Sequence, residues 1–312
     1  MTDSPVLIIA FNRPHKLRQL IASLRSSRPP ILMIAVDGPR SHNKSDETLV
    51  RETQAVVSEI DWPCKIHTRF RESNLGLQTA YVDAVNWAMS EFGETIVIED
   101  DVIAGPELYG YLNFNLNRFR DNQTIGQING YNFVPVDSLT EPNSASRVTR
   151  YPTSYCWASW SHSWNLIDLS IKWGQSVSLK DLSAFTGSQL SATMWKMNFR
   201  NAVSGRVDTW DYAWVASLWE NDLKIISPNR NLCLYDGFDG GTHTRRSAKT
   251  HQLEIESVVD LEEVFNLDID DRADQWQKQF VYRETLTGFL EKGAASFVLE
   301  IEKRSLRRRS EN

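Results

Sequence analysis

The sequence predicts an α/β fold: a Rossmann-like, mostly parallel sheet with helices on both faces, fused to a smaller mixed half. In the first hundred residues, short apolar runs alternate four times with segments of helical periodicity. Polar residues follow these runs directly, at the strand ends where parallel sheets bind ligands. The chain has 312 residues, of which 41% are hydrophobic and 24% charged, so it can bury a large core.

In the first half, the predicted strands are residues 5–11, Ile31–Val36, Lys65–Phe70 and 95–100. The intervening helices show apolar side chains at a spacing of about 3.6 residues. The first helix starts at Pro14, a residue favoured at the first helical position. The second ends near Ile60, and the third covers residues 75–92.

The second half is less regular. We expect a helix over residues 106–120, a strand over 124–132 and two or three helices before Asn221, and then short strands at 223–227 and 231–235. Between these elements lie a Pro- and Ser-rich stretch (134–146), an aromatic segment (155–164) and a glycine-rich loop (237–246). The residues after 246 begin with an acidic stretch, continue with a predicted helix and end in a basic segment. No clear linker separates the halves, so we expect them to share one sheet.

The composition excludes several classes of protein. With 34 basic and 40 acidic residues the net charge is −6, so the chain lacks the excess of positive charge that is typical of nucleic-acid-binding proteins. Cys64, Cys156 and Cys233 are far apart and form no CxxC pair, so neither a disulfide framework nor a structural zinc site is predicted. The N-terminus has no basic region before its short apolar run, and no segment is apolar enough to span a membrane. We therefore expect a reduced, cytoplasmic protein.

Three adjacent carboxylates, Glu99, Asp100 and Asp101, end the fourth strand. Like charges this close repel and are costly to desolvate, so a cation is expected beside them. The alternative is that these carboxylates form a charge cluster at the N-terminus of a helix, which Pro106 could start. The first strand is followed by Asn12-Arg13-Pro14, not by a glycine-rich phosphate loop. A bound nucleotide would therefore need a divalent metal on Asp101 or Asp100 to neutralise its diphosphate.

This acidic strand end belongs to an ordered set of motifs. The motifs are LIIAFNRP, AVDG, RESNLG, VIEDDVIAGPEL, YCWASWSHSW, TWDYAW and ISPNRNLCLYDGFDGGTHT. The set resembles the GT-A fold glycosyltransferases, and in particular a bacterial relative of the N-acetylglucosaminyltransferase I group, with EDD as its form of the DxD motif. The resemblance covers about residues 5–244.

The resemblance implies three regions: a nucleotide-sugar-binding half (1–105), an acceptor-binding and catalytic-base half (106–246), and a C-terminal helical tail with a basic end (247–312). It also implies the donor site. Asp100 would face the sugar and Glu99 the ribose, and the remaining donor-binding residues would be Arg13, Asp37 and Asn74. From the residues alone, Arg13 could be a surface charge, Asp37 a turn residue and Asn74 the cap of the helix that follows.

For catalysis, the resemblance implies a metal, Mn²⁺ or Mg²⁺, bound by Asp101 and by His243 in the late loop. Asp211 would be the catalytic base. Asp208 is the second candidate, because a spacing of three residues could place both side chains on one helix face. Either aspartate could instead be a helix cap, and a lone histidine is more often structural than a ligand. Inverting transfer needs one such base and one metal, and no covalent nucleophile.

Eight of the 11 tryptophans lie between residues 157 and 219. Flat apolar rings suit sugars as well as cores, so Tyr155, Trp157 and Trp160 are predicted to shape the acceptor pocket. Packing in the core is the alternative for most of the tryptophans. In the C-terminal tail, the apolar residues between 289 and 306 precede a basic end that could dock on the inner face of a membrane; packing on the body is the alternative.

The predicted function is transfer of a sugar from a nucleotide-diphosphate donor, UDP-sugar being favoured, to the hydroxyl of a saccharide or lipid-linked saccharide. The setting implied is bacterial surface polysaccharide or glycoconjugate synthesis. One alternative is a sugar nucleotidyltransferase, which should carry a glycine-rich basic loop after its first strand. The other is a carbohydrate-binding protein without catalysis.

Overall fold

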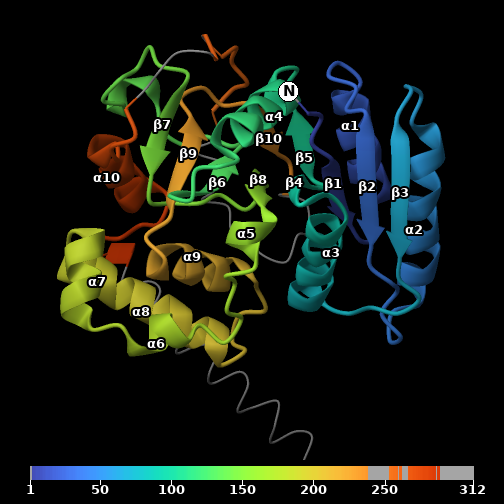
Figure 1. The fold of residues 1–312 in the computed structure, drawn as a ribbon. Coiled ribbons are helices and arrows are strands. Elements are labelled where there is room, and N and C mark those ends of the chain that lie inside the picture. The colour runs from blue at the N-terminus through green and yellow to red at the C-terminus, as the bar shows by residue number, and fades with distance from the viewer. Residues whose placement is uncertain (1, 238–252, 259, 262–265, 286, 289–312) are drawn as a thin grey trace, which may run out of the picture.

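A computed structural model of the chain describes residues 2–237, 253–258, 260–261, 266–285 and 287–288. Its centre is an eight-stranded sheet with the order β3-β2-β1-β4-β8-β6-β9-β7 (Figure 1). Strands from both halves of the sequence belong to this sheet, as predicted. A separate pair, β5 and β10, lies beside its middle.

The first four strands pair in parallel and are rich in β-branched and aliphatic residues. β8 then runs antiparallel between β4 and β6, β9 runs parallel to β6, and β7 closes the sheet antiparallel to β9. The strands are β1 (Val6–Ala10), β2 (Ile31–Val36), β3 (Lys65–Phe70), β4 (Glu94–Glu99), β5 (Val102–Ala104), β6 (Ile125–Asn129), β7 (Ser146–Thr149), β8 (Cys156–Trp160), β9 (Lys224–Pro228) and β10 (Cys233–Tyr235).

Helices cover both faces of the sheet, which confirms the predicted fold class. Because side chains alternate along a strand, Ile8 faces one core with α1, α2 and α4, while Leu7 faces the other with α3, α8 and α9. The helices are α1 (Pro14–Leu24), α2 (Lys44–Ala55), α3 (Leu77–Phe92), α4 (Leu108–Phe119), α5 (Ser161–Trp164), α6 (Lys172–Ser176), α7 (Leu179–Thr186), α8 (Gln189–Val203), α9 (Asp211–Glu220) and α10 (Asp271–Phe280), with 3-10 turns η1 (Val56–Glu59) and η2 (Val136–Ser138).

The second half departs from the prediction in several places, among them the unpredicted edge strand β7. Residues 161–221, which are described throughout, hold five helices instead of two or three, because α5 and α6 are too short for helical periodicity to appear. The aromatic segment at 155–164 supplies β8, a central strand buried on both faces. Within the described residues, no helix combines the length and the apolar character needed to cross a bilayer.

Candidate functional site

An arginine that follows β1, the strand next to β4, binds the acidic end of β4. Arg13, the N-cap residue of α1, donates from Nη1 to Asp101 Oδ2 at 2.9 Å and from Nη2 to Asp100 Oδ1 at 2.5 Å. Asp100 and Asp101 are only 2% and 4% exposed. A cation therefore does lie at this cluster, and it is Arg13 of the chain itself, which the sequence had suggested as a nucleotide contact or a surface charge.

One guanidinium does not balance three carboxylates. Asp100 Oδ2 and Asp101 Oδ1 are buried and have no hydrogen-bond partner within the described residues. Burial raises the pKa of Asp100 to about 7, against the lowering effect of Arg13. Burial, and then the charges of Asp101 and Asp100, also raise the pKa of Glu99 well above its usual value. The site is short of positive charge, so a further cation would be stabilised there.

A metal would find only part of its ligand set here. In the described ranges, no group of three or more His, Cys, Asp or Glu side chains is arranged to hold an ion. His243, the second predicted ligand, lies outside the described residues. The two buried carboxylate oxygens without partners are nevertheless what an oxygen-preferring divalent ion requires. They supply part of a ligand set for such an ion.

The segment after β10 packs directly against this cluster. The backbone N–H of Asp236 donates to Asp101 O at 2.7 Å, and Lys16 Nζ donates to Asp236 Oδ2 at 2.8 Å. A Cβ at Gly237 would lie 2.4 Å from Asp101 Oδ2, so only glycine allows this approach. The glycine-rich motif thus begins in contact with the predicted metal ligand.

Asp37 and Asn74 contact each other. Asp37 accepts hydrogen bonds from the N–H groups of Gly38 (2.9 Å) and Leu75 (3.0 Å) and from Asn74 Nδ2 (2.7 Å). Asp37 thereby ties the loop after β2 to the loop after β3. The proposal that Asn74 caps the long helix is wrong, because the N-cap of α3 is Gly76 and has no side chain to do so.

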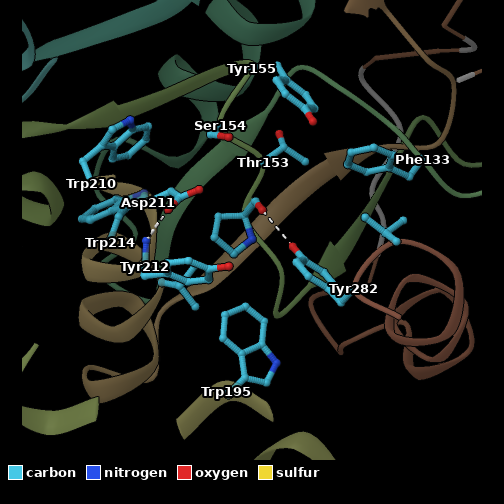
Figure 2. A pocket seen from close by; sticks show the side chains of 13 residues that line it. Phe133, Thr153, Ser154, Tyr155, Trp195, Trp210, Asp211, Tyr212, Trp214 and Tyr282 are labelled. Carbon is cyan, nitrogen blue, oxygen red and sulfur yellow. Dashed lines mark hydrogen bonds between the residues drawn. The ribbon is translucent and has the colours of Figure 1, made fainter. Parts of the chain in front are cut away.

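A cavity of about 180 Å³ lies on the α9 side of the sheet. Figure 2 shows its aromatic walls, which come from the loop before β8, the start of α9, α8 and the segment after α10. The lining residues are Phe133, Pro152, Thr153, Ser154, Tyr155, Trp195, Trp210, Asp211, Tyr212, Trp214, Val215, Val281 and Tyr282.

Asp211 contributes the carboxylate that lines this cavity, from the first position of α9. Its Oδ1 accepts from Thr209 Oγ1 at 2.5 Å and from the N–H of Tyr212 at 2.7 Å, so two donors hold this oxygen in place. Asp208 is exposed, precedes the helix and does not line the cavity. The expectation that both aspartates share one helix face is therefore wrong.

Tyr155 connects the cavity with the acidic strand end. Its ring stacks on Tyr235 at 4.3 Å, and its hydroxyl makes no hydrogen bond within the described part of the chain. Burial raises the pKa of Tyr155, and the charges of Glu99, Asp101 and Asp211 contribute to that rise. The charge of Asp211 also raises the pKa of Glu99. The predicted base and the acidic cluster thus share one electrostatic environment.

Trp157 and Trp160 require a correction. They are 0% and 2% exposed, so neither has surface with which to contact an acceptor. Trp157 donates from Nε1 to Tyr81 Oη and packs in the core beside α9. Trp160, three residues further along the same strand, faces the opposite core. For these two residues the packing alternative is correct.

Sequence reasoning missed several residues that line the cavity: Phe133, Thr153, Ser154, Tyr212 and Tyr282. Tyr212 follows Asp211 in TWDYAW, and that adjacency was a usable signal. The others come from loops and from the segment after α10, where no periodicity indicates which way a side chain points.

Comparisons with known proteins add little. No family model matches the chain, and no curated protein does. Among solved structures, one that matches is 4-diphosphocytidyl-2C-methyl-D-erythritol synthase from Anaerococcus prevotii DSM 20548, with 7% identity over 73% of this chain and 90% of that chain. The TM-score is 0.34, too low to carry any inference. The resemblance to the N-acetylglucosaminyltransferase I group therefore rests on the sequence motifs.

Proposed function

We propose that this protein is a metal-dependent, inverting glycosyltransferase that moves a sugar from a nucleotide-diphosphate donor to a saccharide hydroxyl, with UDP-sugar the favoured donor. One observation carries the proposal: a carboxylate, Asp211, lines an aromatic cavity and acts electrostatically on the acidic strand end, with Tyr155 between them. This supports the proposal that base and donor site belong to one reaction centre.

Asp211 is the proposed general base. Proton removal from the attacking hydroxyl needs a carboxylate within hydrogen-bond reach of the acceptor, held in one orientation. Thr209 and the N–H of Tyr212 hold Oδ1 in this way. The aromatic walls suit the apolar face of a sugar ring. No covalent intermediate is required.

Asp101, with Asp100 beside it, would hold the metal ion, and such an ion would neutralise the departing diphosphate. The two unpartnered oxygens and the raised pKa of Asp100 support this assignment. Arg13, Glu99, Asp37 and Asn74 remain the proposed donor contacts; Asp37 and Asn74 would act by shaping the loops that they join. Docking of the basic tail on a membrane is part of the proposal, but that tail lies outside the described residues.

The test compares Asp211→Asn with Asp208→Asn, a nearby exposed aspartate outside the cavity. A thermal-shift screen of UDP-, GDP-, CMP- and dTDP-sugars, with and without Mn²⁺, first identifies the donor. Asp211→Asn should then lower donor turnover by about 10²- to 10⁴-fold and leave nucleotide binding unchanged. Asp208→Asn should retain wild-type turnover.

Full turnover in Asp211→Asn would refute the base assignment. Binding of sugars without any donor turnover in the wild type would favour the non-catalytic alternative. Pyrophosphate release from a nucleoside triphosphate and a sugar phosphate would identify a nucleotidyltransferase instead.

A further inference from the structure

Arg13 is the solvent-facing partner of Asp100 and Asp101. Its guanidinium occupies one oxygen of each aspartate, and the other oxygen of each is buried. The side chain of Arg13 is 29% exposed, against 3% and 4% for the side chains of the two aspartates. An ion in solvent therefore finds none of the four carboxylate oxygens open, and the group that it meets in their place is positively charged.

At the other end of β4, an arginine binds both oxygens of a buried carboxylate. Oε1 of Glu94 accepts from Ser4 Oγ at 2.7 Å and from Arg120 Nη2 at 2.8 Å, and its Oε2 accepts from Arg120 Nε at 3.0 Å. The guanidinium at the acidic end is instead divided between Asp100 and Asp101, and one oxygen of each has no partner within the described residues. A buried acceptor without a partner is costly, so a cation that binds more of these oxygens would be more stable there.

A divalent ion and this guanidinium would be close neighbours. An ion bound to the aspartates would lie about 2.0–2.6 Å from their oxygens. Nη1 and Nη2 of Arg13 lie 2.9 Å and 2.5 Å from oxygens of the same two carboxylates. Like charges at such short range repel, so Arg13 opposes the ion for as long as it stays in this position.

The side chain of Arg13 can leave the aspartates without disturbing α1. The helix is capped by the carbonyl of Arg13, which accepts from the N–H groups of Lys16 (3.0 Å) and Leu17 (3.2 Å), and its side chain makes no capping hydrogen bond. Within the described residues, its guanidinium donates only to Asp100 and Asp101. Phosphate oxygens match the same planar fork of donors, so a diphosphate beside the strand end would give the guanidinium another partner.

We propose that Arg13 is an internal counter-ion that opposes metal binding at Asp100 and Asp101 until a diphosphate binds its guanidinium, so that metal and nucleotide bind cooperatively. The assignment of metal and diphosphate to this strand end rests on the proposed function. The opposition between Arg13 and a divalent ion does not, and it can be measured without any turnover.

Binding of Mn²⁺ to the full-length protein, followed by electron paramagnetic resonance of the free ion, tests the opposition. Without nucleotide, Arg13→Met should bind Mn²⁺ about 5- to 150-fold more tightly than the wild type, the usual range for coupling between two sites. Arg120→Met is the matched control: it removes an arginine from a buried carboxylate at the far end of β4 and should bind Mn²⁺ like the wild type. Arg13→Lys keeps the positive charge but loses the two-pronged contact, so it should bind Mn²⁺ more tightly than the wild type by a smaller factor, and it decides the test if Arg13→Met does not fold.

The same titration with saturating UDP, or with the nucleotide that the donor screen identifies, measures the cooperativity; a protein-free blank corrects for chelation. The nucleotide should strengthen Mn²⁺ binding to the wild type, and this gain should be smaller in Arg13→Met by the factor found without nucleotide. Equal Mn²⁺ affinity in the two proteins without nucleotide, an equal gain in both, or no Mn²⁺ binding to either would overturn the inference. Tighter Mn²⁺ binding to Arg13→Met, with no nucleotide bound by either protein, would support the opposition but refute the proposed transferase, and with it the cooperativity.

Discussion

At the scale of single residues, the protonation of the acidic strand end depends on the balance between its carboxylates and one guanidinium. Arg13 binds Asp100 and Asp101 in the structure, yet each of these aspartates keeps one buried oxygen without a partner among the described residues. Burial outweighs Arg13, and the pKa of Asp100 rises from its usual 3.8 to about 7. The site is thus electrostatically incomplete, as a site for a cationic ligand would be.

This shift predicts a pH dependence of stability. Between about pH 4 and pH 7 the folded protein keeps a proton on Asp100 that the unfolded chain has released, so stability falls as the pH rises through this window. The loss from this group is at most about 4 kcal/mol. Urea unfolding at pH 5 and pH 8 should show the wild type losing stability relative to Asp100→Asn, whose side chain is neutral at both values.

Mn²⁺ at pH 8 should recover part of that loss in the wild type, because a second cation favours the ionised carboxylates. An identical pH profile in wild type and variant would show that Asp100 is already ionised across this range, and the argument for a missing cation would lose its basis.

At the scale of elements, the loops at the carboxyl ends of β2 and β3 form one unit. Asp37 accepts from Gly38, Asn74 and Leu75, and a Cβ at Gly38 would lie 2.4 Å from the carbonyl carbon of Ser73. Asp-Gly after β2 is therefore more than a turn. It sets where the loop before α3 runs, and with it one side of the proposed donor site.

Asp37→Ala should therefore destabilise the protein even without nucleotide. The substitution leaves the N–H groups of Gly38 and Leu75 without their acceptor, at a cost of about 1–3 kcal/mol. Urea unfolding measures this, and the exposed Asp208→Ala is the control. Unchanged stability together with a large loss of nucleotide affinity would instead indicate that Asp37 contacts the bound nucleotide directly, as the resemblance implies.

At the scale of the whole molecule, one sheet joins the two halves of the sequence. β4 of the first half pairs with β8 of the second over five residue pairs, from Glu94↔Trp160 to Ile98↔Cys156. The boundary at residue 105 therefore separates predicted roles, while the sheet itself continues across it. Where these halves join, the carbonyl of Tyr155 in the cavity lining accepts a hydrogen bond from the N–H of Glu99 at 3.3 Å.

The continuous sheet predicts cooperative unfolding. The full chain should unfold in one transition that is the same by tryptophan fluorescence and by far-ultraviolet circular dichroism. A fragment of residues 1–105 should not fold alone, because without β8 the edge of β4 and its buried side chains Ile96, Val97 and Ile98 would be exposed. A soluble, folded fragment with its own sharp transition would contradict this.

The sequence by itself determined the parallel half of the sheet, because buried strands and amphipathic helices leave local periodic patterns from Val6 to Glu99. It also located the acidic trio at a strand end. Only the tertiary structure decided that Trp157 and Trp160 are core, that Arg13 binds the aspartates and that Thr153 and Tyr282 share a cavity with Asp211. These facts depend on which distant segments pack together, and long-range packing leaves no periodic mark in a local stretch of sequence.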